Sequence, residues 1–568
     1  NNSKRKSDGI SIKLSALDAR YELNQYETVQ KRLYGRLKEL VLKAKEYDLQ
    51  VTVDAEEAAR LELSLSLMER LWLDPDLDGY EQVGLAVQAY QKRAFYVLDF
   101  VINIAKKTNK NIPVRLVKGA YWDTEIKLAQ ENGYNNYPVF TRKVHVDISY
   151  IACANKMLDN IDAIYPQFAT HNAHTIALIK ELSKDKKIKS DEFEYQCLYG
   201  LGDSIYESWL MQGSNKDLTC RVYAPVGVYK DLLAYLVRRL LENGANSSFL
   251  HKMNLKDITP KDLVVDPFSK FYETKGKMHP KIALPKNIFN NLNNIRLNSH
   301  GDNLFYAKDL LKISNDYIKI KNNLDLNNLD LKVENTPIKN LDQIMQNAQQ
   351  AFIKFRKTDV NIRAAKLNKL ADLLNNNRVY LYDLLIREAG KSLPNAISEV
   401  REAEDFCRYY AVEAQNLLGE GKYLSGPTGE DNTFYYESRG VMVSISPWNF
   451  PLAIFLGGVA ASLACGNCVI AKPAGVTPKI AQAAIDLCYK AGFDKDVVQC
   501  VYGSGRTHGM GLIKHKYAAG VIFTGSTQTA SHINKALSER EGEILPLIAE
   551  TGGLNMMIVD SSALLEQV

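Results

Sequence analysis

The chain has 568 residues, which is too long for one ordinary domain, so we expect roughly two to four domains. Its 46% hydrophobic and 24% charged residues are typical of a soluble globular protein, and the net charge of +5 gives no electrostatic argument for binding nucleic acid or an anionic membrane. The eight cysteines are scattered without the spacing of a disulfide scaffold, which favours a reducing cytoplasm.

Residues 9–244 alternate between short apolar strands and amphipathic helices, a pattern typical of parallel βαβ units. The N-terminus shows no signal peptide and no methionine, and a strand begins almost at once. A (β/α)8 barrel needs eight strands, and this region supplies seven, so the sequence predicts a barrel whose first strand is missing. The seven predicted strands are ISIKLSAL, QVTVDA, LAVQAY, PVRLVKGAY, YPQFATHN, FEYQCLYG and CRVYAPVG.

Polar residues stand near the carboxyl end of nearly every predicted strand, and that end forms the active face of such a barrel. Several of them are cations, and with the arginine pair of the closing helix they would give one mouth five positive charges. An anionic ligand is then required, because the cations would otherwise repel one another. The strand-end residues are Lys13, Asp54, Gln88, Arg115 with Lys118, Thr170 with His171, Gln196 and Tyr223.

The closing helix AYLVRRLLENGANSSF (234–249) places Tyr235, Arg238, Arg239 and Glu242 on one broad face. One interpretation is a solvated polar stripe. The other is a guanidinium pair that binds a carboxylate or a phosphate. An unrelated barrel that binds a phosphorylated substrate also fits five cations, although no glycine-rich phosphate loop follows the late strands.

From about residue 250 to residue 340 the chain becomes rich in Asn and Lys, which predicts a domain boundary or linker. A second α/β region follows, with helical periodicity over 341–418 and then a turn-rich patch, LSGPTGEDN (424–432). The expected division is a barrel over 1–265, a linker and the start of the second domain over 266–340, and an incomplete NAD-binding domain over 341–568.

The apolar stretch 451–471 is about as long as a membrane span, but Gly466 and Asn467 interrupt it and β-branched residues follow. We therefore predict a buried helix, a tight turn and a buried strand. Cys465 and Cys468 flank this turn with the spacing of a redox pair or half of a zinc site. Since no second pair accompanies them, we interpret them as packing residues and expect no metal.

Five motifs of the second half join a strand to a polar or glycine-rich turn. Gly-Ser at a helix N-terminus after a strand suits pyrophosphate, because the first backbone N–H groups of a helix are free. Together, in this order, the motifs resemble the aldehyde dehydrogenase superfamily, which implies a Rossmann-type NAD-binding domain. They are VMVSISPWNFP (441–451), VIAKPAGVTP (469–478), VYGSGRTHG (501–509), GVIFTGSTQTA (520–530) and LPLIAETGGLN (545–555).

This resemblance implies roles for the matching residues. Asn449 would donate its amide to the oxyanion of a thiohemiacetal, and Glu550 would activate the water that hydrolyses the acyl-enzyme. Lys472 would bind the adenosine ribose of NAD, and Ser526 would contact its pyrophosphate. The full set implied for NAD is Ile445, Trp448, Lys472, Gly505, Gly525 and Ser526.

The sequence departs from the aldehyde dehydrogenase pattern at two points. Gly475 stands where the family usually has an acidic residue, which weakens the inferred ribose contact. The family's nucleophilic cysteine follows the glutamate by a few dozen residues, and none of the eight cysteines fits that role. With this sequence, the second half is expected to bind NAD but not to form the thioester.

Seven stretches of the first half resemble the proline dehydrogenase barrel of the bifunctional proline utilization A flavoproteins. The resemblance implies FAD-dependent oxidation of L-proline to pyrroline-5-carboxylate, coupled to NAD-dependent oxidation of glutamate semialdehyde to glutamate. The stretches are GISIKLSALDARYE, VDAEEAARLE, VQAYQKR, RLVKGAYWD, YPQFATHNAHT, CRVYAPVG and YLVRRLLENGANSSF.

For the barrel, the resemblance implies that Arg238 and Arg239, with Lys13, bind the proline carboxylate. Tyr121 and Tyr223 would wall the pyrrolidine ring, and Asp54 would balance the cationic cluster. The residues implied to line FAD are Gln88, Arg115, Lys118, Gly119, Trp122, Thr170, His171, Asn172, Gln196 and Glu242.

Two alternatives stay open: a proline dehydrogenase alone, and a DNA-binding transcriptional regulator that acts through an N-terminal module missing from this sequence. The near-neutral charge offers no basic face for DNA. The family implies proline and glutamate semialdehyde as substrates and a membrane quinone as electron acceptor. We expect a homo-oligomer in the cytoplasm, with peripheral contact to the inner membrane as a further possibility.

Overall fold

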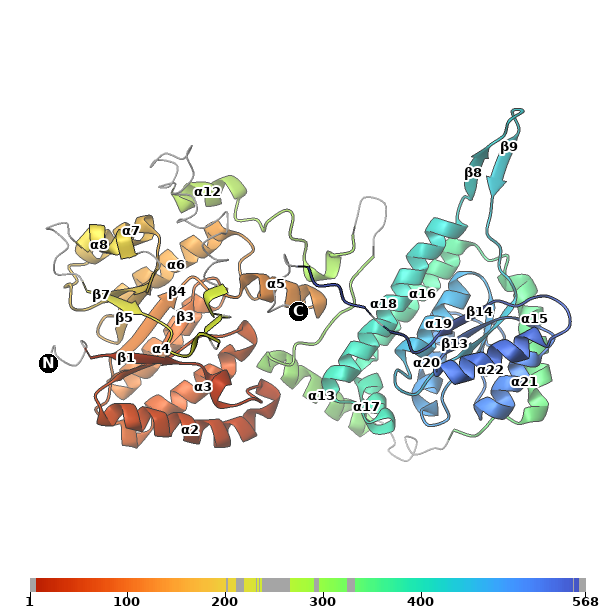
Figure 1. Cartoon of the computed structure of the whole chain (residues 1–568), viewed down its shortest axis with the longest axis horizontal. Helices are drawn as coiled ribbons and strands as arrows, with labels where there is room; N and C mark the ends of the chain where they lie inside the picture. Colours follow the sequence, from red (N-terminus) through yellow and green to blue (C-terminus); the bar gives the residue numbers. More distant parts are fainter. Residues whose placement is uncertain are drawn as a thin grey trace.

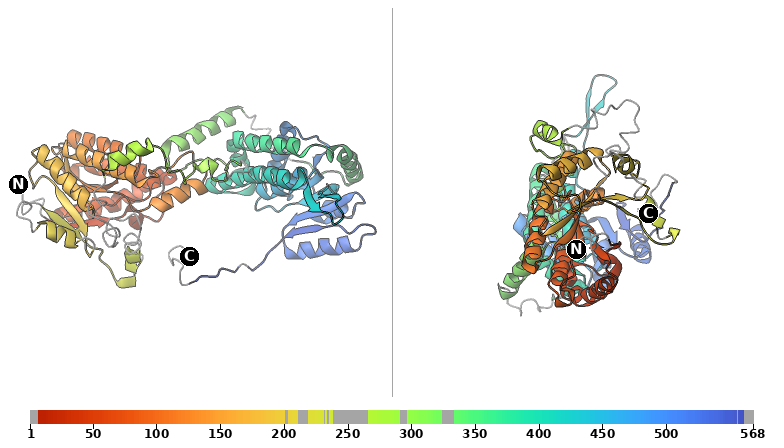
Figure 2. Two further views of the ribbon diagram at one scale, coloured as in Figure 1. Left: turned by 90° about the horizontal axis from the view of Figure 1, so that it is seen from above. Right: turned by 90° about the vertical axis from the view of Figure 1, so that its left-hand side faces the viewer.

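The structure is a computed structural model that describes residues 7–200, 203–210, 219–230, 232–233, 235–237, 266–290, 296–323, 333–554 and 556–560. Two α/β units lie at opposite ends of an elongated molecule, the first in red to yellow and the second in cyan to blue (Figures 1 and 2). Arg238, Arg239 and Glu242 of the closing helix lie outside the described residues.

Seven parallel strands form the first sheet in chain order, and all seven predicted strands are confirmed. Strands β2, β3, β5 and β6 are buried at every residue, as expected where helices cover a parallel sheet. The strands are β1 (Gly9–Ile12), β2 (Gln50–Val53), β3 (Val83–Gln88), β4 (Ile112–Val117), β5 (Ile164–Ala169), β6 (Glu194–Leu198) and β7 (Cys220–Tyr223).

Helices connect these strands and surround the sheet (Figure 1). The two ends of the sheet come close together, because Arg221 of β7 donates a hydrogen bond of 2.8 Å to the backbone oxygen of Ser7. The sheet therefore curls as in a barrel, which confirms the predicted fold class. The helices are α1 (Leu14–Leu17), α2 (Tyr26–Glu46), α3 (Leu61–Trp72), α4 (Ala94–Thr108), α5 (Trp122–Glu131), α6 (Lys143–Leu158), α7 (Ala173–Asp185) and α8 (Asp203–Leu210).

A polar network runs through the interior of this barrel. Glu194 is fully buried and accepts hydrogen bonds from Arg221, at 2.9 and 3.1 Å, from Gln167 at 2.8 Å, and from Gln196 at 2.7 Å. Gln167 donates in turn to Gln50 at 3.2 Å. Since buried polar groups are costly unless they are hydrogen-bonded, this network fixes the side chains that reach the carboxyl ends of the strands.

The segment after the barrel is bonded to both halves of the molecule. Its amides contact the barrel: the backbone of Gly301 donates to Gly133 at 3.1 Å and that of Ala307 to Glu62 at 3.0 Å. On the other side, Ser299 donates to Asp405 of helix α18 (Leu393–Leu418) at 2.9 Å. The elements here are α12 (Pro267–Thr274) and α13 (Ala307–Asn323), and the domain boundaries at 265 and 340 stay predictions.

Asp302 in this segment forms a buried ion pair whose loss should destabilise the second half. Arg378 donates two hydrogen bonds to it, at 2.8 and 3.1 Å, and Tyr382 donates a third at 3.0 Å. Burial opposes ionisation, but His300 and Arg378 hold the pKa of Asp302 well below its usual range. We expect Asp302→Asn to cost about 3–5 kcal/mol at neutral pH, because Arg378 is left buried and unpaired.

The pH dependence of that cost follows from the direction of the shift. A carboxyl with a depressed pKa stabilises the folded state above its unfolded pKa, about 3.9, and loses that contribution as the pH falls further. Urea unfolding of Asp302→Asn and of the original protein at pH 7 and below pH 4 should show a gap that narrows in acid. An equal gap at both pH values would contradict the pairing.

The second half begins with four helices, which confirms the periodicity over 341–418: α15 (Leu341–Phe355), α16 (Val360–Asn376), α17 (Arg378–Ala389) and α18 (Leu393–Leu418). A parallel sheet in the order β12-β11-β10-β13-β14 follows. Its strands are β10 (Val441–Ile445), β11 (Cys468–Lys472), β12 (Val498–Cys500), β13 (Ala518–Thr524) and β14 (Leu547–Glu550). Its helices are α19 (Ala453–Ala464), α20 (Pro478–Ala491), α21 (Met510–Lys514) and α22 (Thr527–Ser538).

The turn-rich patch 424–432 is the tip of a hairpin of strands β8 (Lys422–Ser425) and β9 (Asp431–Phe434). The hairpin projects far from the body of the second half (Figure 1). All eight strand residues are exposed. Because neither strand packs one face on a core, the sequence does not alternate between apolar and polar residues here. The sequence therefore predicts the turn but not the strands beside it.

The apolar stretch 451–471 folds as predicted, into α19, a turn and β11, and both elements are largely buried. In the part of the chain that the structure describes, no helix is long and apolar enough to cross a bilayer. Cys468 is buried in β11, whereas Cys465 is exposed after α19. Among the described residues, no group of three or more His, Cys, Asp or Glu side chains is placed to hold a metal ion.

Candidate functional site

Arg115 lies at the centre of the residues that gather at the carboxyl end of the barrel. Its guanidinium donates to Asp54 at 2.8 Å, to Gln196 at 2.7 Å and to Ser11 at 2.8 Å, and it lies 5.2 Å from the ring centre of Tyr223. Because these partners come from β1, β6, β7 and the residue after β2, one buried side chain of β4 joins much of the barrel mouth.

Lys13 and Tyr121 form a second contact at the same end of the sheet. The Lys13 ammonium donates to the Tyr121 hydroxyl at 2.7 Å, and Lys13 follows β1 while Tyr121 precedes α5. Lys13 thus contacts a residue predicted to bind the substrate, and Arg115, which is predicted to line FAD, contacts two more, Asp54 and Tyr223. Lys118 instead forms an ion pair with Asp147 of α6.

Asp54 is charged less readily than an ordinary aspartate. Burial raises its pKa, although Arg115 and Lys13 act in the opposite direction. Asp54 therefore lies between two cations, and its role in balancing the charge of a substrate site stays a prediction.

The other residues implied for FAD lie at strand ends in local contacts of their own. Gln88 donates to the backbone of Glu56 at 2.7 Å, and the Trp122 indole donates to the backbone of Phe140 at 2.8 Å. Asn172 caps α7, Thr170 accepts from the Asn172 amide at 3.2 Å, and His171 accepts from the Leu198 amide at 3.1 Å.

Gly119 occupies a position that only glycine fits. Its φ is +130°, and a Cβ there would lie 2.5 Å from the ring of Tyr90. The turn after β4 therefore packs its backbone directly against the Tyr90 ring.

The second sheet places its motifs at one edge. Strand order reverses between β10 and β13, and ligands of open α/β sheets bind outside the carboxyl ends of the strands at such a reversal. Ile445 is the register partner of Lys472 on one side and of Phe523 on the other. The predicted NAD residues at the ends of β10, β11 and β13 thus lie along one edge of the sheet.

The residues predicted to bind NAD at this edge make local contacts. Ser526 caps α22 by accepting from the Thr529 amide at 3.2 Å, so the helix presents its N-terminus beside Gly525. Gly505 opens a helical turn, and a Cβ there would meet open space. Lys472 is buried, which lowers its pKa, and its ammonium donates to the Pro473 backbone at 2.9 Å.

Asn449 follows β10 and Glu550 ends β14, so the two residues lie near the carboxyl ends of different strands of the same sheet. Asn449 and the neighbouring Trp448 are exposed in the loop between β10 and α19. Glu550 ends β14 and is also exposed, and its backbone oxygen accepts from the Gly525 amide at 3.1 Å. Gly475 lies exposed after β11, and a Cβ there would meet open space, so an acidic side chain would fit at this position without a clash.

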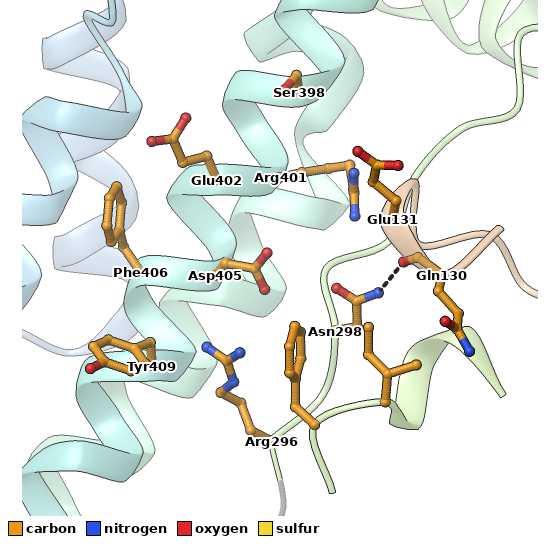
Figure 3. A pocket seen from close by; sticks show the side chains of 12 residues that line it. Gln130, Glu131, Arg296, Asn298, Ser398, Arg401, Glu402, Asp405, Phe406 and Tyr409 are labelled. Carbon is orange, nitrogen blue, oxygen red and sulfur yellow. Dashed lines mark hydrogen bonds between the residues drawn. The ribbon is translucent and has the colours of Figure 1, made fainter. Parts of the chain in front are cut away.

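A cavity of about 410 Å³ lies where the two halves meet (Figure 3). The end of α5, residues next to Asn298 and one face of α18 line it, and Arg401, Glu402 and Asp405 point into it from that helix. Asn298 donates to the backbone of Gln130 across its floor at 2.9 Å. None of the site residues predicted from the sequence lines this cavity.

Sequence reasoning missed several partners of the predicted residues. Ser11 accepts from Arg115 and Glu194 accepts from Gln196, and each stands two positions before a predicted site residue, Lys13 just after β1 and Gln196 within β6. Alternate residues of a strand share a face, so the signal was available in the spacing. Asp147, which pairs with Lys118, lies on a helix where nothing in the sequence distinguishes it from a surface carboxylate.

These features define the chain as a proline dehydrogenase-type barrel followed by an aldehyde dehydrogenase-type α/β domain. Residues 1–252 match the proline dehydrogenase family, and residues 322–568 match the aldehyde dehydrogenase family. Over nearly its whole length the chain is similar to the bifunctional PutA proteins, and it carries a proline dehydrogenase domain and part of an aldehyde dehydrogenase domain in one polypeptide.

Individual relatives agree with this assignment. The chain is 42% identical over 594 residues to the bifunctional protein PutA of Klebsiella aerogenes, covering 99% of this chain and 44% of the relative. The corresponding Rhizobium meliloti protein is 43% identical over 586 residues, covering 99% of this chain and 46% of the relative. The chain thus spans about half the length of the curated relatives it matches.

Solved structures give the same result. A structure of proline utilization A with proline bound in remote sites is 46% identical, has a TM-score of 0.91, and is matched over 98% of this chain and 55% of its own. A Bradyrhizobium japonicum PutA mutant is 45% identical with a TM-score of 0.89, matched over 96% of this chain and 54% of its own. Both halves therefore share fold and order with PutA.

Proposed function

We propose that the barrel oxidises L-proline to pyrroline-5-carboxylate with FAD, and that the second half takes part in NAD-dependent oxidation of glutamate semialdehyde to glutamate. The observation that carries the proposal is the convergence of Arg115, Asp54, Gln196, Lys13 and Tyr121 at the carboxyl end of a proline dehydrogenase-type barrel. The name of the relatives, bifunctional protein PutA, supports both activities on one chain.

In the barrel, one group of residues binds the substrate and a second group holds the cofactor. Lys13 with Arg238 and Arg239 binds the proline carboxylate, Tyr121 and Tyr223 wall the ring, and Asp54 balances the charge. FAD, when bound, would accept the two electrons that leave proline as a hydride. Its proposed lining is Gln88, Arg115, Lys118, Gly119, Trp122, Thr170, His171, Asn172, Gln196 and Glu242.

The activity of the barrel can be tested on the purified chain. We expect flavin absorption bands in its visible spectrum and proline-dependent reduction of an artificial electron acceptor. A colourless protein that binds inorganic phosphate or a phosphorylated compound would favour the alternative barrel function. Flavin bands without any response to proline would contradict the substrate.

Arg239→Met should weaken proline recognition more than flavin retention. A charge-assisted pair contributes about 1.5–3 kcal/mol, so we expect roughly a 10- to 150-fold loss in kcat/KM for proline. Because Arg239 lies outside the described residues, this prediction rests on the sequence resemblance. Lys230→Met, at an exposed cation nearby in the chain, is the control, and equal kinetics of both variants would remove Arg239 from the substrate site.

In the second half, Asn449 stabilises the negative charge that develops on the aldehyde oxygen, and Glu550 takes a proton from the attacking water. Ile445, Trp448, Lys472, Gly505, Gly525 and Ser526 hold the cofactor, and NAD, when bound, accepts the hydride from the aldehyde carbon. All eight cysteines precede Glu550 in the chain, whereas the family's thiol nucleophile follows it. This activity is therefore proposed for a protein that extends to that thiol.

The partners follow from the same proposal. The substrates are proline and glutamate semialdehyde. The protein is cytoplasmic and contacts the inner membrane peripherally, where a membrane quinone reoxidises the flavin. A homo-oligomer is supported by the exposed β8–β9 hairpin, where Tyr423, Leu424, Phe434, Tyr435 and Tyr436 lie at the surface. Light scattering of the purified chain, with the hairpin intact and with these side chains replaced by Ser, measures this contribution.

A further inference from the structure

Two helices of the second sheet begin without a cap of their own. The residues at their N-caps, Leu452 before α19 and Thr477 before α20, make no side-chain hydrogen bond to the first turn. A helix that starts in a buried position needs partners for its first backbone N–H groups. Both helices obtain these partners from carboxylates elsewhere in the chain.

Glu399 of α18 supplies the cap of α19. Its Oε1 accepts from the Leu452 amide at 2.8 Å and from the Ala453 amide at 3.3 Å. Glu388 of α17 does the same for α20, accepting from the Lys479 and Ile480 amides at 2.9 Å each. A negative charge at a helix N-terminus is favoured by the helix dipole as well as by these bonds.

Glu399 differs from an ordinary cap in being fully buried and paired. Its exposed fraction is 0%, and the Lys391 ammonium lies 2.5 Å from its Oε2. The same ammonium lies 4.1 Å from the ring centre of Phe450. Lys391 thus contacts Phe450 and Glu399 binds the Leu452 amide, and these residues lie one and three positions after Asn449, on either side of Pro451.

We propose that Glu399, together with Lys391, is a positioning residue that fixes the loop carrying Asn449 between β10 and α19. The inference rests on the proposed role of Asn449, whose amide must be held in place to stabilise charge on an aldehyde oxygen. A buried ion pair contributes little net stability, so the reason to keep one here is the geometry it imposes.

The first test is amide hydrogen exchange on the chain, with Glu388→Ala as the matched control. Glu399→Ala should speed exchange at the Leu452 and Ala453 amides by roughly 10-fold or more, because these amides lose charge-assisted hydrogen bonds. Exchange at the Lys479 and Ile480 amides should stay unchanged. Glu388→Ala should do the reverse. Glu399→Ala leaves Lys391 unpaired, so the double variant Glu399→Ala with Lys391→Met is made as well. If the Leu452 amide still exchanges slowly in the folded single or double variant of Glu399, the proposal is overturned.

The second test is catalytic and uses the protein extended to its thiol nucleophile. Glu399→Ala should lower kcat for the semialdehyde about 10- to 100-fold, since a displacement near 1 Å can cost that much, while the Kd for NAD changes less than about threefold. Unchanged kcat with a released loop would overturn the positioning role. If the original protein lacks aldehyde oxidation, the proposed function fails instead, and the exchange experiment still decides whether Glu399 holds the loop.

Discussion

Arg115→Met should unfold the barrel at lower denaturant concentration and release its cofactor. The guanidinium is buried and donates to Asp54, Gln196 and Ser11, so its removal leaves a carboxyl and an amide without their donor. Breaking a buried pair in this way costs about 3–5 kcal/mol. Urea unfolding followed through flavin absorption and through circular dichroism measures both losses.

Two further variants separate the ion pair from the loss of a large side chain. Arg356→Met removes an exposed pair with Glu437 and should cost less than about 1 kcal/mol. Arg115→Met with Asp54→Asn should be less harmful than the sum of the single changes, by about 0.5–3 kcal/mol. Since Arg115 lowers the pKa of Asp54, Arg115→Met should also let Asp54 take up a proton at higher pH. Additive effects would contradict the coupling.

The barrel could be predicted from sequence because its information is local. Each strand is a short apolar run, and strands of this kind at βαβ spacing leave few topologies open. The position of a residue near the end of its strand is also visible in the local sequence, so Lys13, Arg115 and Gln196 could be assigned to one end of the barrel. Parallel strands bring their carboxyl ends together whatever their order.

The contacts among those residues could not be predicted in the same way. Whether Arg115 reaches Asp54, Gln196 or Ser11 depends on the register of strands far apart in the chain. The network from Arg221 to Gln50 also requires the curvature of the sheet, which alternation in one strand does not encode. Registers are set by packing, and packing is a property of the whole barrel.

The connecting segment shows a different limit. Its Asn-rich composition predicted a linker, yet Asn298, Ser299 and Asp302 bond to the barrel and to the helices of the second half. The sequence alone does not distinguish a polar side chain that is buried against another domain from one that is exposed to solvent. The same holds for Glu388 and Glu399, which read as exposed helix positions until the helices they cap are in place.

Glu550→Gln, in the protein extended to its nucleophile, should slow the release of glutamate without preventing the first half of the aldehyde reaction. Glu550 ends β14 beside the turn of Gly525, where a bound dinucleotide would lie, and an amide in its place cannot accept a proton from water. NAD binding and the first hydride transfer should stay nearly intact. The steady-state rate should fall about 10²- to 10⁴-fold, the usual contribution of a general base.

The signature is a burst of NADH followed by a slow steady rate, because the acyl-enzyme accumulates when its hydrolysis becomes limiting. Rapid-mixing absorbance of NADH resolves the two phases. Glu543→Gln is the matched control, since Glu543 is also exposed and lies in the turn that leads into β14. A surface carboxylate at position 550 would give the same burst-free trace as that control, and such a result would remove Glu550 from the proposed catalytic residues.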